Sequence, residues 1–143
     1  MTTTVTLNPQ ILGQAENAHR AMLEQILRGT TMTYHQWVGL TLAAVAGGEI
    51  PIDQLVSRLT GALKTDGATA RNALAELAAA ELIEHSDTIR VTDLGKSRFG
   101  SIRADIDGAM VRAYADIAAE DLATAGRVLA RVTTQLNAVL ETV

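Results

Sequence analysis

The pattern of apolar residues changes its period once along this chain, between residues 83 and 91. On both sides of this stretch apolar residues recur every three or four positions, as in amphipathic helices. Within it, Ile83–His85 and Thr88–Val91 alternate apolar and polar residues around Ser86-Asp87. This alternation predicts two short strands and a tight turn, that is, a β-hairpin inside an otherwise helical chain.

Two helices are expected ahead of residue 50. The first covers residues 9–29, because proline fits the first turn of a helix and the glycine at position 29 stops the run. The second begins at Thr33, where Thr33 and Gln36 have the spacing of a capping box, and ends at Gly47-Gly48. Residues 1–8 are rich in threonine and are expected to form a flexible tail.

Two further helices, separated by a tight turn, precede the hairpin. They are expected over Ile52–Leu63 and from about Ala68 to Ala80, with Asp66 as the N-cap of the second. Helical spacing predicts that the buried stripe of this second helix contains Ala70, Ala73, Leu74 and Leu77. Its opposite face then carries Ala68, Asn72, Ala75 and Ala79, flanked by Arg71 and Glu76. Such small side chains let a helix approach another surface closely.

Two long helices are expected after the hairpin. Thr92 and Asp93 can cap the first, whose apolar residues continue to Ile117, and Glu120-Asp121 favour the start of the last by their charge. The last helix has apolar residues at helical spacing, namely Leu122, Val128, Leu129, Val132, Leu136, Val139 and Leu140. Because a chain of 143 residues has limited core to offer such a face, we expect a homodimer.

This order of elements predicts a mainly α fold of the winged helix-turn-helix type, with a short β-hairpin wing. Residues 9–143 are interpreted as one domain. Within it, residues 33–95 form the winged helix-turn-helix lobe, and residues 9–29 and 96–141 supply the terminal helices for dimerisation.

Composition narrows the function. The chain has no cysteine, which excludes disulfides, cysteine nucleophiles and thiolate metal sites, and its three histidines lack ligand spacing. No metal or cofactor is therefore expected. The longest apolar stretch, Val38–Gly48, is too short to cross a bilayer, and no secretory signal is visible, so a cytoplasmic protein is expected. The net charge of −4 argues against general polyanion binding, although residues 58–103 carry a net +1.

Five stretches resemble one family. They are the start of the second helix (Met32-Thr33-x-x-Gln36-Trp37-x-x-Leu40), the third helix (Ile52-x-x-Leu55-x-x-x-Leu59), the fourth (Asp66-Gly-Ala-Thr69-Ala-Arg71-Asn72-x-Leu74-x-x-Leu77), the step after the hairpin (Val91-Thr92-x-x-Gly95) and the start of the last helix (Ala119-Glu-Asp-Leu122). Their order and spacing, over most of the chain, resemble the MarR family of bacterial regulators. Two features depart from it: Ser86-Asp87 replaces a longer wing loop that often contains an Asp-x-Arg element, and Glu81 stands where glycine is frequent.

The resemblance implies a transcriptional regulator that binds double-stranded DNA as a symmetric dimer, with half-sites about 10 base pairs apart. On the recognition helix, Asn72 suits adenine, and Arg71 suits guanine or a phosphate. The alternative for Arg71 is a surface ion pair with Asp66 or Glu76. The full set of candidate DNA contacts is Arg58, Lys64, Thr65, Thr69, Arg71, Asn72, Arg90, Lys96 and Arg98.

The resemblance also implies a small aromatic or lipophilic effector. Met22, Tyr34 and Trp37 are the candidate contacts, and ordinary core packing is the alternative for all three. A winged-helix module that binds protein instead of DNA is the competing function. An enzyme is not expected, because no convergent acid–base or metal constellation is visible in the sequence.

Overall fold

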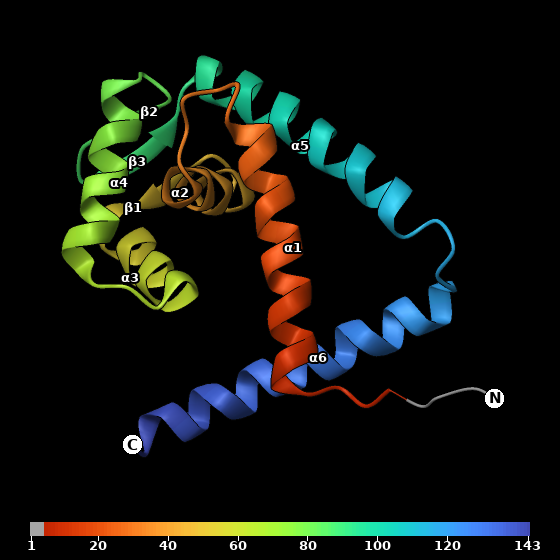
Figure 1. Ribbon diagram of the computed structural model, residues 1–143. Coiled ribbons are helices and arrows are strands. Elements are labelled where there is room, and N and C mark those ends of the chain that lie inside the picture. Colours follow the sequence, from red (N-terminus) through yellow and green to blue (C-terminus); the bar gives the residue numbers. More distant parts are fainter. Residues whose placement is uncertain (1–4) are drawn as a thin grey trace. The chain divides into compact units, whose positions relative to one another are not determined.

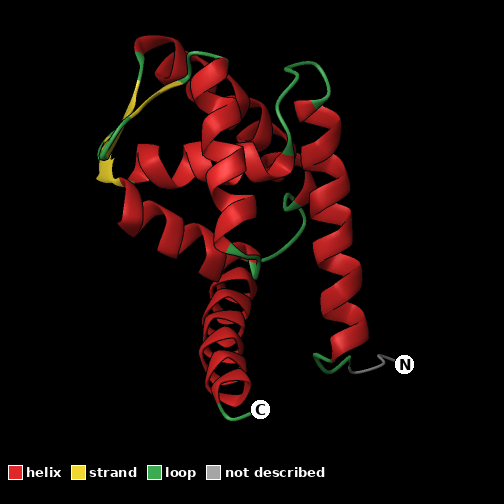
Figure 2. Ribbon diagram, turned by 90° about the vertical axis from the view of Figure 1, so that its left-hand side faces the viewer, coloured by secondary structure: helices red, strands yellow, loops and turns green. Residues whose placement is uncertain are grey.

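The computed structural model describes residues 5–143, and its chain is mainly helical with one small sheet (Figure 1, Figure 2). The elements are α1 (Pro9–Leu27), α2 (Tyr34–Val45), β1 (Glu49–Pro51), α3 (Ile52–Leu63), α4 (Gly67–Ala79), β2 (Ile83–His85), β3 (Thr88–Val91), α5 (Asp93–Ala113) and α6 (Ala119–Glu141). They fall into two compact units, one ending at Asp107 and the other covering Gly108–Val143. None of the helices in the described part of the chain is long and apolar enough to cross a membrane.

The first two helices begin at capping residues, of which the sequence predicted Thr33 but not Asn8. Asn8 caps α1, accepting from the Ile11 N–H at 2.9 Å, with Pro9 in the first turn. The predicted capping box of α2 is confirmed, because Thr33 and Gln36 each accept from the other's backbone N–H at 3.2 Å. Of the expected N-terminal tail, residues 1–4 lie outside the described residues, and residues 5–8 are exposed and neither helical nor extended in a sheet.

The wing contains one strand more than the sequence predicted. The expected hairpin of β2 and β3 is present, and β1 pairs antiparallel with the other edge of β3, giving the strand order β1-β3-β2. β1 escaped prediction because it has only three residues, one of them Pro51, and follows the turn at Gly47-Gly48. An edge strand tolerates this proline, whose missing N–H is not needed on the outer side. The register places Arg90 between Glu49 and Glu84.

The core of the first unit lies among α2, α3, α4 and the sheet. Its fully buried large side chains are Leu40, Leu55, Leu59, Leu74, Leu77, Ile89 and Ile102. Trp37 joins this core at 5 % exposure and stacks on Phe99 with ring centroids 5.4 Å apart. The predicted buried stripe of α4 is confirmed residue by residue, so the opposite face of that helix is exposed.

The long helix α5 is shorter than predicted. It ends at Ala113, so the assignment of Ile117 to this helix was wrong: the Ile117 N–H donates to the Tyr114 carbonyl in the turn before α6. The second unit contains α6, which has Glu120 and Asp121 in its first turn, as expected. No residue of α6 is buried, and its exposed large apolar side chains are Val128, Leu129, Leu136, Val139 and Leu140.

Candidate nucleic-acid interface

The turn between α3 and α4 sets the start of the candidate recognition helix. Lys64 ends α3 in the left-handed conformation, with φ of 53°, and Thr65 and Asp66 lead into α4. Asp66 caps α4 by accepting from the Thr69 N–H at 2.7 Å. This backbone hydrogen bond, with a second from the Thr69 side chain, lowers the pKa of Asp66. The cap therefore prefers the carboxylate, and the Thr69 hydroxyl is engaged by Asp66.

Removing this cap should destabilise the protein in a pH-dependent way. Because the folded-state pKa of Asp66 is depressed, its stabilising effect is present above about pH 4 and is lost as the pH falls further. We expect Asp66→Ala to lower the melting temperature at pH 7, and the difference from wild type to shrink in acid. Asp66→Asn, which keeps an N-cap acceptor, is the control. Equal melting curves for Asp66→Ala and wild type at pH 7 would contradict this role.

The outward face of α4 carries the two predicted base-reading residues. Arg71 Nη2 pairs with Asp53 Oδ1 of α3 at 3.3 Å, and not with Asp66 or Glu76 as the sequence alternative supposed. The side chains of this pair are 53 % and 89 % exposed, respectively. Because exposed ion pairs of this kind contribute little free energy, Arg71 can exchange Asp53 for a phosphate or a base at small cost.

Asn72 and Glu76 are one helical turn apart and bonded to each other. Asn72 Nδ2 donates to Glu76 Oε1 at 2.9 Å, and Gln36 Nε2 of α2 donates to Glu76 Oε2. The sequence offered Glu76 as an alternative partner of Arg71, and it gave Gln36 a role in the capping box alone. The contact escaped prediction because it joins residues 40 positions apart.

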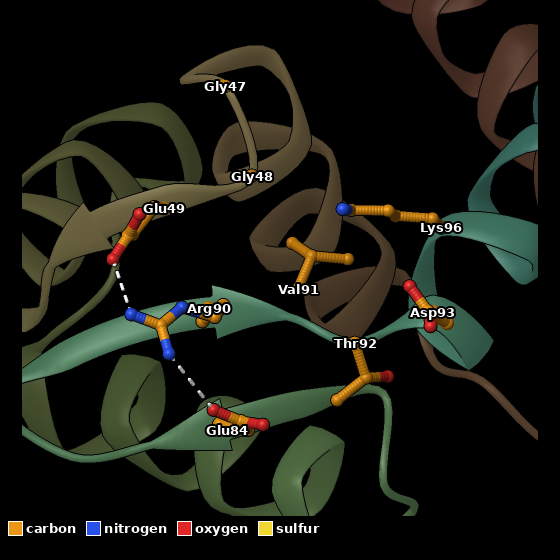
Figure 3. Close-up of a pocket in the computed structure, with 9 residues that line it drawn as sticks. All are labelled: Gly47, Gly48, Glu49, Glu84, Arg90, Val91, Thr92, Asp93 and Lys96. Atoms are coloured by element: carbon orange, nitrogen blue, oxygen red, sulfur yellow. Dashed lines mark hydrogen bonds and ion pairs between the residues drawn. The ribbon is translucent and has the colours of Figure 1, made fainter.

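The wing arginine lies between two carboxylates. Arg90 contacts Glu49 at 2.6 Å and Glu84 at 3.5 Å, one on each neighbouring strand (Figure 3). The hydrogen bond and charge of Glu49, followed by the charge of Glu84, raise the pKa of Arg90. The three side chains sum to a net charge of −1. A phosphate that approaches Arg90 would therefore meet a group of net negative charge.

The remaining candidate DNA contacts are dispersed over several elements. Lys96 lines a pocket of about 460 Å³ at the base of the wing, together with Arg90. Arg98 is half-buried and donates to the Thr30 carbonyl at 3.5 Å, toward the connection between α1 and α2. Arg58 is exposed on α3. The structure thus groups Arg71, Asn72, Thr69 and Thr65 on or beside α4, whereas Arg98 belongs to another region of the first unit.

The three candidate effector contacts also occupy different surroundings. Trp37 is buried in the core, as in the packing alternative, and Met22 is half-buried on α1. Tyr34 lines a hollow of about 240 Å³, whose other lining residues are Arg20, Glu24, Thr33 and His35. The Arg20 guanidinium carbon lies 4.3 Å from the centroid of the Tyr34 ring, a cation–π contact.

The similarity of this chain to known proteins was found among solved structures. No family model matches it, and no curated protein sequence matches it. Ligand-free NadR is 20 % identical with a TM-score of 0.76, and 89 % of this chain covers 95 % of that one. A MarR family transcriptional regulator from Silicibacter pomeroyi DSS is 18 % identical with a TM-score of 0.76 (91 % and 89 %). CouR from Rhodococcus jostii RHA1, bound to p-coumaroyl-CoA, is 15 % identical with a TM-score of 0.75 (86 % and 88 %).

These likenesses establish the fold. It is a winged helix-turn-helix, mainly α, with a small antiparallel wing. More particularly, it is the fold found in MarR family regulators, and the predicted fold class is confirmed.

Proposed function

We propose that this chain is a MarR-family transcriptional repressor that binds a pseudo-palindromic operator in double-stranded DNA as a homodimer. The outward face of α4 carries this proposal. It presents small alanine side chains with Arg71 and Asn72 among them, directly after the capped turn of the helix-turn-helix. Alanine lets the helix enter a major groove, while an arginine and an asparagine supply donors and acceptors for base edges and phosphates.

The same face argues against the competing function. A winged-helix module that binds protein would be expected to carry large apolar side chains there, because buried anchors of that kind dominate protein interfaces. The exposed residues of α4 are instead small or polar. Their chemistry favours nucleic acid.

The homodimer is supported by α6. Five large apolar side chains of this helix are between 37 % and 58 % exposed, an apolar face that a second copy would cover. A two-fold dimer also fits the proposed operator, because it would place two copies of α4 one turn of DNA apart, about 10 base pairs.

The proposed function includes release from DNA by a small aromatic effector. NadR has been solved with 4-hydroxyphenylacetate and CouR with p-coumaroyl-CoA, both of which contain a phenol. In this chain the hollow at Tyr34 offers an aromatic ring, the Arg20 guanidinium and His35, which suit a small aromatic ligand. Such a ligand releases DNA only if it binds the DNA-incompetent state more tightly than the competent one.

The direct test is selection of genomic fragments by the purified chain, followed by anisotropy titration of the selected site at two salt concentrations. The proposal expects saturable binding to a short pseudo-palindrome that survives competitor DNA. Binding that disappears with competitor, and no enriched motif in the selection, would overturn it.

Arg71→Ala is expected to weaken operator binding by about 10- to 100-fold, the range for losing one good base or phosphate contact. Because Arg71 is exposed and its ion pair is weak, melting temperature and oligomeric state should not change. Arg127→Ala, which removes an exposed arginine from α6, is the matched control and should leave binding unaltered. Equal operator affinity for Arg71→Ala and wild type would remove Arg71 from the interface.

A further inference from the structure

A negatively charged side chain occupies the outward face of the helix that the proposed function places against DNA. Glu76 lies one turn beyond Asn72 on α4 and is exposed. A carboxylate there is repelled by phosphates, so for a DNA-binding helix its presence requires a reason.

Both oxygens of this carboxylate are engaged by amides. Oε1 accepts from Asn72 Nδ2 at 2.9 Å, and Oε2 accepts from Gln36 Nε2. The Gln36 amide is itself fixed from α2, since its Oε1 accepts from the Thr33 N–H at 3.2 Å in the capping box. Gln36 can therefore present only its nitrogen to Glu76. The carboxylate is anchored on one side by α2 and bonded on the other to Asn72.

This arrangement fixes which way the Asn72 amide faces. A carboxylate accepts hydrogen bonds only, so the amide nitrogen must face Glu76, and the flipped amide would bring two acceptors together. The amide nitrogen has two hydrogens. When the one pointing away from its carbonyl goes to Glu76, the carbonyl oxygen and the hydrogen beside it stay available on the same edge. Adenine requires that donor–acceptor edge, at its N7 and N6 atoms.

We propose that Glu76, held by Gln36, is a positioning residue that presets Asn72 to read adenine in the major groove. The proposal deepens the proposed function and rests on it. Presetting lowers the side-chain entropy that Asn72 loses when it binds a base. Glu76 thus acts through Asn72 and makes no base contact of its own, and its charge additionally weakens binding to DNA that offers no adenine at that position.

Removing the Glu76 carboxylate should have two opposite effects. Discrimination for adenine at the Asn72 position should fall, because the amide is then free to flip. Affinity for non-specific DNA should rise, because a charge that repels phosphates is gone. A residue that merely stabilised α4 would reduce both affinities together.

The test is selection of bound duplexes from a randomised pool by the full chain, for wild type, Asn72→Ala, Glu76→Ala and the double variant. The position lost in Asn72→Ala identifies the adenine. At that position we expect Glu76→Ala to reduce the preference over other bases by about 10-fold, within the range for one bidentate contact. The double variant should show no further loss of adenine preference beyond that of Asn72→Ala alone, since Glu76 acts through Asn72. Glu76→Gln, which keeps one acceptor for Asn72, should restore part of the preference. Thermal melting of each variant verifies folding.

The outcomes separate this proposal from the one on which it rests. If wild type enriches no motif, the DNA-binding function and the role of Glu76 both fall. If wild type enriches a motif and Glu76→Ala keeps the full adenine preference, only the role of Glu76 falls. The role of Glu76 is also contradicted if Glu76→Ala loses the preference for a different base, such as cytosine. The carboxylate would then contact that base itself.

Discussion

Gly95→Ala is expected to lower the free energy of unfolding by about 3 kcal/mol, at the upper end of the range for overpacked sites. Gly95 is buried in the first turn of α5, at the step from the wing into that helix. A Cβ at this position would overlap the carbonyl oxygen of Leu82 and lie 2.9 Å from Val91 Cγ1. The first neighbour is backbone, which cannot rotate away, and it already accepts from the Thr92 N–H at 3.1 Å. Relief of the overlap therefore requires the wing and α5 to separate.

A second glycine of the same helix gives a matched control. Gly100 lies in the middle of α5, is exposed, and would place a Cβ in open space. Gly100→Ala should stabilise the chain by up to about 1 kcal/mol, because alanine has the higher helix propensity. Urea denaturation followed by circular dichroism measures both variants. A Gly95→Ala midpoint equal to that of wild type would show that the junction is looser than the contact geometry implies.

The elements that the sequence predicted well are those with local determinants. Three of these determinants act within a few residues, and each feature appears where expected. They are the capping box at Thr33, the N-cap at Asp66 and the alternation on either side of Ser86-Asp87. β1 depends on pairing with a strand some 40 residues later, and its own three residues carry no period. Its existence is determined by tertiary contact, so a reading of local pattern could not detect it.

The candidate site shows the same division. Helical periodicity was sufficient to place Arg71 and Asn72 on the exposed face of α4. Their partners could not be read from periodicity, because Asp53 and Gln36 belong to α3 and α2. The ion pair between Arg90 and Glu49 could not be predicted either, since Glu49 lies on β1, the strand that the sequence did not reveal.

Position 81, just after α4, has a left-handed backbone conformation without being a glycine. Glu81 stands where the family that the sequence resembles often has glycine. The φ of Glu81 is +64°, in the left-handed region that favours glycine, so a glutamate adopts this conformation here. The Thr92 hydroxyl donates to the Glu81 carbonyl at 2.7 Å, which helps to hold this turn.

Leu136→Asp is expected to convert the proposed dimer to monomer. Apolar residues of α6 follow an alternating spacing of three and four, at Leu122, Ala125, Leu129, Val132, Leu136 and Val139. Leu136 is 52 % exposed in the single chain, so it stabilises little within its own subunit and is available to a second copy. A symmetric interface loses the residue twice. At about 1.5–3 kcal/mol for each buried leucine, the dissociation constant should rise at least 100-fold, before the cost of desolvating two carboxylates.

Sedimentation equilibrium across a concentration series measures this shift, with far-UV circular dichroism to verify that the helices remain. Thr134→Asp adds the same charge to the same helix but on the face opposite the apolar spacing, and it should sediment as wild type does. A dimer that persists in Leu136→Asp would place the subunit contact elsewhere than on α6. The monomer should also bind the operator much more weakly than the dimer. Each subunit would then bind a single half-site, and the second α4 would no longer contribute to the same binding step.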